Sequence, residues 1–314
     1  MKSARFNTAP ENSIELEYGS DAISLQRYVA DFQSGLTEPG YLKSHLTGSS
    51  YPLEISFTST NMLPRYTLDH FCHTLPVEQR LPATLKLLND DFKQSLPAST
   101  RAALQKLQQG ELHYGAWLGL RADELGCTGK IYCEVSCEAE LDPAWQQLSD
   151  ALPHSKQLRM LGIDLRHNTA ELYFRCADLT PELFAPMLAP IGRFNDVGYF
   201  ISAIEAAYGY KLDGRFPGGN IGVSYSIDAS GKPVSITLYL YCRSFWGRDQ
   251  SCRVGFSKLL ASRNMSPEQY RQVTKDLVFN SGAQTQHGML GFSFGSAGQV
   301  EYGIGFCPYN GGHS

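Results

Sequence analysis

The sequence contains no long apolar segment and no strong excess of charge of either sign. No apolar run approaches the roughly 20 residues that a membrane-spanning helix needs, and the opening segment MKSARFNTAPENS lacks the apolar core of a signal peptide. The 27 basic and 31 acidic residues give a net charge of −4, so no global positive field favours nucleic acid or an anionic membrane. We therefore expect a cytoplasmic protein with no nucleic-acid or membrane partner, in which any anion site is local.

Several widespread catalytic and metal-binding motifs are also missing. The run Asn89-Asp90-Asp91 is not followed by a third aspartate at DDxxD spacing. The glycine-rich pieces at 214–220 and 295–299 are typical of turns rather than of a P-loop or a dinucleotide fingerprint. His70 and His73 have the chemistry of metal ligands, but burial in a strand is the better interpretation of both.

The eight cysteines are scattered along the chain, at positions 72, 127, 133, 137, 176, 242, 252 and 307. Cys133 and Cys137 are four residues apart, but no CxxC pair or histidine pair completes a zinc site. Cys133, Cys137, Cys176 and Cys242 fall on the apolar faces of expected strands. We therefore predict buried, reduced thiols rather than metal ligands or disulfides.

What the sequence does contain is a repeated order of helix, strand, strand. Helical patterns are expected at about 21–32, 81–94, 98–108, 143–152, 180–208, 253–263 and 266–279. Strand pairs are expected at about 51–59 and 65–72, 113–119 and 129–137, 157–165 and 170–177, 220–228 and 233–243, and 288–295 and 299–307. Because no linker or low-complexity segment interrupts this order, residues 1–314 are predicted to form a single domain of five repeated units.

Ten strands in hairpins can close into an antiparallel barrel, which removes the unpaired edges of the sheet. The strands alternate between an apolar and a polar face, and the helices need the apolar face to dock on. The polar face then lines the lumen and carries Lys130, Tyr132, Glu134 and Ser136 from one strand, Glu171, Tyr173 and Arg175 from another, and Ser235, Thr237, Tyr239, Tyr241 and Arg243 from a third. The sequence therefore predicts an α+β fold, a ten-stranded antiparallel β-barrel ringed by helices, with a polar lumen wide enough to be a reaction chamber.

The stretch YPLEISFTSTNMLPR (51–65) places a carboxylate in this lumen. Glu54 alternates with apolar neighbours on its strand, and Arg65 follows eleven residues later. Two roles stay open for Glu54. As a structural acid it would pair with Arg65; as a functional acid it would accept a hydrogen bond from an aromatic N–H or O–H and make the ring more nucleophilic.

The lumen cations Arg65, Lys130 and Arg175 need anionic partners, because burying an unpaired charge is costly. One source is a ligand such as a diphosphate, to which tyrosine hydroxyls can also donate while the ring faces stabilise a carbocation. The other source is the protein itself, through structural ion pairs with Glu134, Glu171 or Glu301. A third possibility is that a strand in another register exposes these side chains on the surface. The alternation pattern does not decide among the three.

Short motifs in these strands resemble a known family. PLEIS (52–56) followed by Arg65 resembles the PxE-x-S strand of the dimethylallyltryptophan-synthase-type indole prenyltransferases, and Lys130-Ile131-Tyr132 resembles their KxY strand. LGIDLR (161–166) with ELYFR (171–175) resembles the third hairpin of soil-bacterial aromatic prenyltransferases and of the cyanobactin peptide prenyltransferases. The likeness extends over the whole chain as five ααββ units, the ABBA or PT barrel.

The resemblance implies an enzyme of secondary metabolism. It would move a dimethylallyl or geranyl group from its diphosphate to an indole-containing natural product, such as an alkaloid, by Friedel–Crafts alkylation. The implied catalytic residue is Glu54, which would orient the indole through its N–H. The implied diphosphate ligands are Arg65, Lys130, Tyr132, Tyr173, Arg175, Tyr225 and Tyr239, and the implied acceptor pocket contains Trp117, Thr237 and Tyr241.

This chain also departs from the family pattern. Glu171 and Tyr173 stand where fungal relatives carry cations, and Glu301, Gly303 and Gly305 stand where relatives often carry Lys or Tyr. No cofactor is clearly required, but Glu134, Glu171 or Glu301 could admit Mg²⁺ beside the diphosphate, or the extra space could admit a geranyl chain. Two alternative functions stay open: prenylation of Tyr, Trp, Ser or Thr in a cyclic peptide, and non-catalytic carriage of an aromatic ligand.

Overall fold

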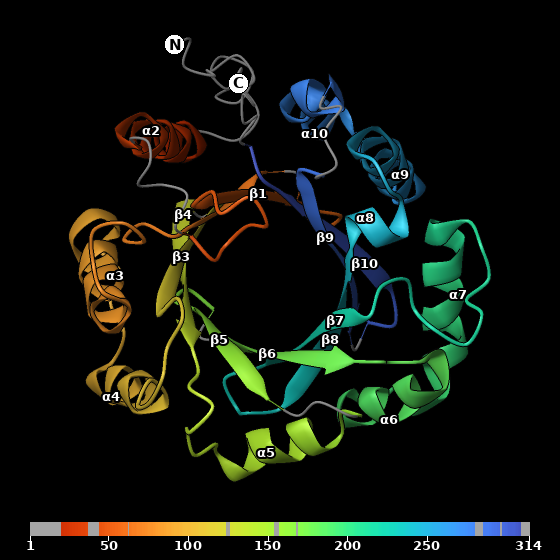
Figure 1. Cartoon of the computed structure of the whole chain (residues 1–314), viewed down its shortest axis with the longest axis horizontal. Coiled ribbons are helices and arrows are strands. Elements are labelled where there is room, and N and C mark those ends of the chain that lie inside the picture. Colours follow the sequence, from red (N-terminus) through yellow and green to blue (C-terminus); the bar gives the residue numbers. More distant parts are fainter. Residues whose placement is uncertain are drawn as a thin grey trace.

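A closed ten-stranded antiparallel barrel forms the centre of the molecule (Figure 1). The computed structural model describes residues 20–36, 44–61, 63–123, 126–153, 157–167, 169–279, 285–295 and 297–308, so the opening segment MKSARFNTAPENS lies outside the described residues. The strands are β1 (Leu53–Thr58), β2 (Arg65–Leu68), β3 (Ala116–Asp123), β4 (Gly126–Glu134), β5 (Leu158–Asp164), β6 (Thr169–Ala177), β7 (Asn220–Ile227), β8 (Pro233–Tyr241), β9 (His287–Gly295) and β10 (Val300–Phe306). The predicted fold class is confirmed.

The helices lie around the outside of the barrel (Figure 1). They are α2 (Ser20–Gly35), α3 (Val77–Phe92), α4 (Ala98–Leu107), α5 (Pro143–Asp150), α6 (Phe184–Leu188), α7 (Val197–Tyr208), α8 (Cys242–Phe245), α9 (Asp249–Ser262) and α10 (Glu268–Val273). Helix α5 begins as its sequence predicts, because Pro143 fills the first position and the Asp142 carboxylate accepts the Ala144 N–H at 2.9 Å. None of the helices described here has the length and hydropathy that crossing a bilayer demands.

The barrel closes between its first and last strands. β1 pairs with β10 through Ile55 and Phe306 and through Phe57 and Ile304. Just beyond this ladder the Ser59 N–H donates to the carbonyl of Tyr302 at 2.8 Å. Each strand therefore has a neighbour on both sides, and the sheet has no open edge.

Alternation along the strands separates the core from the lumen. On β1, Leu53, Ile55 and Phe57 are buried beneath the helices, while Glu54 and Ser56 face the lumen. The same division holds on β6 and β8, whose outward residues are buried and apolar: Leu172, Phe174, Cys176, Ile236, Leu238 and Leu240. The hydrophobic core is thus a shell between sheet and helices, and it stabilises the barrel without filling the lumen.

Tyr225 lies in this outer shell, and the prediction that it lines the lumen is wrong. Its side chain is fully buried, and its hydroxyl donates to the carbonyl of Met187 in α6 at 2.8 Å. The lumen-facing residues of β7 are Gly222, Ser224 and Ser226 instead. Tyr225 therefore cannot contact a ligand bound inside the barrel.

Three further expectations change at the ends of strands. β8 ends at Tyr241 because Cys242–Phe245 form α8, so Arg243 is not part of a strand. Cys137 is exposed beyond the end of β4 rather than buried. β2 ends at Leu68, so His70 and His73 lie in a turn, where the His70 ring stacks on Phe32 with centroids 5.2 Å apart and His73 is exposed.

Candidate active site in the barrel lumen

The lumen holds two adjoining cavities of about 860 and 750 Å³. We call the first the rim cavity, which is lined by Arg159, Arg175, Tyr241 and Arg243, and the second the inner cavity, which is lined by Arg65, Lys130, Tyr132 and Tyr239. Seven residues line both: Leu46, Glu54, Trp117, Met160, Tyr173, Gly222 and Met289. The cavities are therefore two halves of one chamber, each large enough for a small organic molecule.

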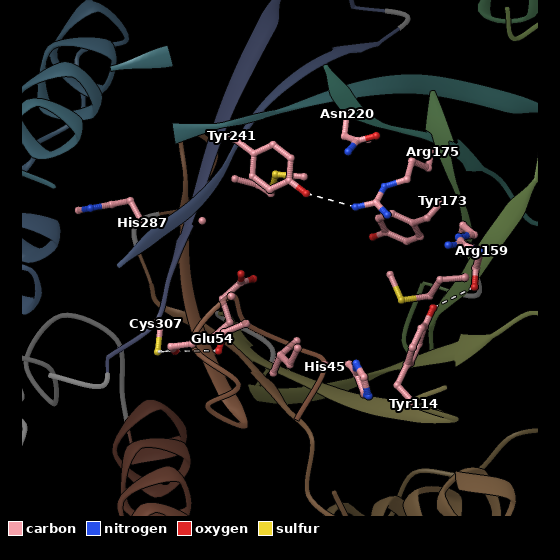
Figure 2. A pocket seen from close by; sticks show the side chains of 18 of the residues that line it. His45, Glu54, Tyr114, Arg159, Tyr173, Arg175, Asn220, Tyr241, His287 and Cys307 are labelled. Carbon is pink, nitrogen blue, oxygen red and sulfur yellow. Dashed lines mark hydrogen bonds between the residues drawn. The ribbon is translucent and has the colours of Figure 1, made fainter. Parts of the chain in front are cut away.

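Glu54 lies where the two cavities meet. Its carboxylate points from β1 into the opening (Figure 2). Burial raises the pKa of this carboxyl from 4.5 to about 7. Among the residues that the structure describes, no ion pair joins Glu54 to Arg65. The structural pairing considered from the sequence is therefore wrong, and the carboxylate is available to a ligand.

Lys130 is buried at 3% exposure and is already paired. Its Nζ lies 2.6 Å from Oε2 of Glu171 and donates to the Tyr173 hydroxyl at 3.2 Å, and the Tyr173 hydroxyl in turn donates to Glu171. Burial alone would raise the pKa of Glu171, but the Lys130 ammonium and these hydrogen bonds lower it to about 2. For Lys130, the alternative of a structural ion pair is the one that the structure supports.

Arg65 is the inner-cavity cation that has no carboxylate partner of its own. No hydrogen bond or ion pair engages its guanidinium within the described residues. Burial lowers the pKa of Arg65, and the nearby Arg121 lowers it further. Arg121, in contrast, lies 3.2 Å from the carboxylate of Asp164. A desolvated guanidinium beside a second one is a strong site for an anion.

Three tyrosine rings form one wall of the inner cavity. The centroids of Tyr132 and Tyr173 are 6.0 Å apart, and those of Tyr173 and Tyr239 are 6.1 Å apart. Burial raises the pKa of Tyr239, so its hydroxyl stays protonated and able to donate. The wall thus offers hydroxyl donors to an anion and electron-rich ring faces to a cation. The Lys130 ammonium lies over two of these rings, 4.9 Å from the Tyr132 centroid and 5.6 Å from the Tyr173 centroid.

The rim cavity is the more cationic half of the chamber. The Arg175 guanidinium donates to the Tyr241 hydroxyl at 3.3 Å, as Figure 2 shows, and Arg159 and Arg243 line the same opening. Glu54 is the one carboxylate among the described residues of this lining. Arg175 is therefore separated from Arg65, Lys130, Tyr132 and Tyr239, the predicted diphosphate ligands that line only the inner cavity. Of the two remaining predicted ligands, Tyr173 lines both cavities and Tyr225 lines neither.

The three predicted acceptor residues are likewise divided. Trp117 lines both cavities and stacks on Tyr114 with ring centroids 4.3 Å apart. Tyr241 lines the rim cavity, whereas Thr237 lines the inner cavity and its hydroxyl bonds to that of Ser293 at 2.7 Å.

Among the acids considered for Mg²⁺, Glu134 has a different task. Its carboxylate accepts backbone N–H groups of His113, Tyr114 and Gly115 at 2.6–3.0 Å and so fixes the loop before β3. Glu171 is paired with Lys130, and Glu301 is exposed. Within the described residues, no group of three or more His, Cys, Asp or Glu side chains is arranged to hold a metal ion.

Comparison with solved structures identifies the architecture. The 5-dimethylallyltryptophan synthase from Streptomyces coelicolor matches with a TM-score of 0.70 and 17% identity, covering 95% of this chain and 94% of that chain. This chain has the ABBA prenyltransferase fold. The prenyltransferase PriB matches with a TM-score of 0.72, 15% identity and coverages of 95% and 93%. AnaPT from Neosartorya fischeri matches with a TM-score of 0.59, 15% identity and coverages of 98% and 93%.

No model of a protein family and no curated protein sequence matches this chain. Several of the similar structures contain ligands. The S. coelicolor enzyme was solved with DMASPP and Trp, and PriB was solved with L-tryptophan and dimethylallyl thiolodiphosphate. At these low identities the likeness defines the fold of this chain, and the chemistry has to be argued from its own residues.

Sequence reasoning missed several residues that line the chamber. Arg121 is the most important, because it is a second guanidinium beside Arg65. The alternation in AWLGLRAD contains the signal, since Trp117, Gly119 and Arg121 share the lumen face of β3. Met160 and Met289, which line both cavities, were also not anticipated.

Proposed function

We propose that this protein is an aromatic prenyltransferase that moves a dimethylallyl or geranyl group from its diphosphate to an indole-containing acceptor. One observation carries the proposal. A guanidinium without a protein partner (Arg65) and a carboxylate without a protein cation (Glu54) line the same tyrosine-walled cavity. Such a chamber suits a pair of ligands, one an anion and the other a hydrogen-bond donor.

The diphosphate is assigned to the inner cavity. Two of its three cations are already paired, Lys130 with Glu171 and Arg121 with Asp164, so Arg65 is the cation left for an anionic ligand. The bond between the allylic carbon and its oxygen breaks, and the electron pair leaves with the diphosphate. The cations stabilise this leaving group from buried positions, where fixed charges contribute most.

The allyl cation is assigned to the tyrosine wall. Ring faces attract a cation by roughly 1–2 kcal/mol each when the site is desolvated, and Tyr132, Tyr173 and Tyr239 present three rings to one volume. The hydroxyls of Tyr132 and Tyr239 can donate to the departing diphosphate, whereas the single proton of the Tyr173 hydroxyl is already donated to Glu171. The same wall therefore serves both products of the ionisation and shields the cation from water.

The acceptor is assigned to the junction with the rim cavity. There the Glu54 carboxylate can accept the indole N–H, which orients the ring and raises its electron density. A ring carbon then attacks the allyl cation, and transfer of the ring proton to the released diphosphate restores aromaticity. Trp117, stacked on Tyr114, offers a flat surface for an aromatic acceptor beside Glu54. The Trp bound in the S. coelicolor enzyme supports an acceptor of this kind.

The test is product formation. The purified protein is incubated with dimethylallyl or geranyl diphosphate and with indoles, tryptophan derivatives and cyclic peptides that contain Tyr, Trp or Ser/Thr, and products are identified by mass. A mass gain of one prenyl group on an indole supports the proposal, and a gain on a peptide alone selects the peptide enzyme. Acceptor binding with no transfer from either donor indicates a carrier. Parallel reactions with a chelator test the Mg²⁺ hypothesis.

A further inference from the structure

The lumen wall of β9 and β10 carries a pair of facing glycines. Gly291 and Gly303 are directly opposite each other in the ladder, and both line the inner cavity. Neither has a positive φ, so the backbone at both positions is of a kind that any residue adopts. The absence of two side chains leaves a notch in the wall, which we call the glycine notch.

Two other lumen glycines, Gly162 and Gly119, are required because neighbouring side chains occupy the space where their Cβ atoms would lie. A Cβ on Gly162 would lie 2.6 Å from Cε of Lys130, and one on Gly119 would lie 2.8 Å from the Tyr132 ring. These positions make room for neighbouring side chains. In the glycine notch, by contrast, a Cβ on Gly291 would meet nothing closer than 3.4 Å, and one on Gly303 nothing closer than 3.6 Å. The fold does not need glycine there, because a Cβ at either position would make only ordinary contacts with its neighbours.

The walls of the glycine notch are largely hydrocarbon. The atoms nearest to Gly291 are the methyl carbon of Thr237 and two ring carbons of Tyr239, and those nearest to Gly303 are the methyl carbon of Thr58 and the Phe57 carbonyl oxygen. Both threonine hydroxyls are engaged elsewhere. That of Thr237 bonds to Ser293 at 2.7 Å, and that of Thr58 bonds to Thr60 at 3.0 Å. The methyl groups are thus left to face the notch.

The strand register places this apolar notch next to the anion site. Ser56 pairs with Arg65 on one side and with Gly305 on the other. Thr58, the next lumen-facing residue of β1, pairs with Gly303. The row of lumen-facing residues that contains Thr58 and Gly303 is therefore next to the row that contains Arg65 and Ser56. A ligand whose diphosphate binds at Arg65 can place a flexible apolar tail against this neighbouring hydrocarbon surface.

We propose that the glycine notch holds the second isoprene unit of the donor, so that the protein uses geranyl diphosphate in preference to dimethylallyl diphosphate. This inference rests on the proposed function, because it assumes that the anion at Arg65 is an allylic diphosphate. In this arrangement the first five carbons lie at the tyrosine wall, and the next five exchange water for methyl groups and a tyrosine ring in the notch.

The experiment compares the two donors in the wild type and in Gly291→Leu, whose side chain would occupy the notch. We expect the wild type to have the higher kcat/KM with geranyl diphosphate. Gly291→Leu should lower that kcat/KM by about tenfold or more, the scale of a lost apolar contact in a pocket, and should reverse the donor preference. Gly198→Ala, on the outer helix α7 with open space around it, is the control for both donors. Thermal unfolding shows that each variant is folded.

Two outcomes overturn the inference while leaving the proposed function intact. They are a wild type that transfers dimethylallyl but not geranyl, and a folded Gly291→Leu variant that loses both activities equally. Failure of the wild type to transfer either group would instead contradict the proposed function. A milder Gly291→Ala variant, whose Cβ makes only ordinary contacts, supports the argument if its donor ratio falls between the wild type and Gly291→Leu.

Discussion

The Glu54 side chain occupies the space into which a side chain at Gly305, on the neighbouring strand β10, would project. A Cβ on Gly305 would lie 2.7 Å from the carboxyl carbon of Glu54, so the acid stands in the lumen only because β10 presents no side chain there. No cation of the described residues compensates the charge, and burial raises the pKa of the carboxyl to about 7. The barrel thus holds a costly group in one orientation, which is expected of a residue retained for chemistry rather than for stability.

The substitution Gly305→Ala tests whether this orientation matters. The added methyl group should displace the carboxylate without removing any polar atom. Misplacing a catalytic group by about 1 Å can cost about 100-fold in rate, and we expect kcat/KM for prenyl transfer to fall by roughly 10- to 100-fold. The control is Gly198→Ala, which adds the same methyl group on the outside of the barrel. Unchanged kinetics in a folded Gly305→Ala protein would contradict the role of Glu54.

Glu54→Gln separates activity from stability through pH. Because burial raises the pKa of the folded-state carboxyl from 4.5 to about 7, the unfolded state ionises first as the pH rises. Glu54 therefore destabilises the fold progressively between these values, by on the order of 3 kcal/mol above pH 7. We expect Glu54→Gln to have lost transfer activity, to unfold at a higher temperature than the wild type at pH 8, and to match it near pH 4. Equal melting temperatures at both pH values would contradict this account.

Arg65→Ala should affect ligand binding rather than folding. Arg65 has no ion-pair partner among the described residues and is destabilised by Arg121, so its removal should leave the melting temperature unchanged or higher. Binding of the diphosphate donor should weaken by about tenfold or more, since a hydrogen bond to a charged group is worth about 1.5–3 kcal/mol. Arg65→Lys keeps the charge but loses the planar, bidentate donor geometry of the guanidinium, so its affinity for the donor should be intermediate. Calorimetric titration with inorganic diphosphate measures the effect directly.

Lys130→Ala, in contrast to Arg65→Ala, should lower the free energy of unfolding. It leaves the Glu171 carboxylate buried without its cation, and breaking a buried pair typically costs about 3–5 kcal/mol. Denaturant unfolding should therefore show a large loss of stability at pH 7. The double variant Lys130→Met with Glu171→Leu should recover most of it, because the unpaired charge is gone. If Lys130→Ala were as stable as the wild type, the ion pair would not hold the lumen wall together.

Tyr225→Phe and Tyr239→Phe form a matched pair across the sheet. Tyr225 donates to the Met187 carbonyl outside the barrel, so its loss should cost about 1 kcal/mol of stability and leave transfer kinetics unchanged. Tyr239 lines the inner cavity, so Tyr239→Phe should lower kcat or raise the donor KM. Thermal unfolding and steady-state kinetics on both variants check this, and loss of activity in Tyr225→Phe would place that residue in the site after all.

The fold was predictable because its main signal is local. Alternation of apolar and polar residues sets which face of each strand docks on helices, and it placed Glu54, Lys130 and Tyr173 in the lumen. The same rule places Tyr225 outside, between Val223 and Ile227. The prediction for Tyr225 failed because residue type was given more weight than strand position.

The pairing of charges inside the barrel was not predictable, because it depends on distances between strands. Lys130 on β4 reaches Glu171 on β6 across β5, and it can do so because Gly162 lies between them. No spacing in the sequence encodes that contact. The charged residues of the chamber can be found in the sequence, but only the geometry shows that Lys130 forms an ion pair while Arg65 does not.

Closure of the barrel has a consequence for how the protein is made. The contacts that seal β1 to β10 join residues 243 positions apart in the chain, as in the Tyr302 N–H donating to the Ser59 hydroxyl. At synthesis rates of about 5–20 residues per second, β1 waits on the order of 12–50 s on the ribosome before its partner strand emerges. Until then its backbone edge is exposed to other nascent chains, so efficient production should depend on chaperones that shield the growing sheet.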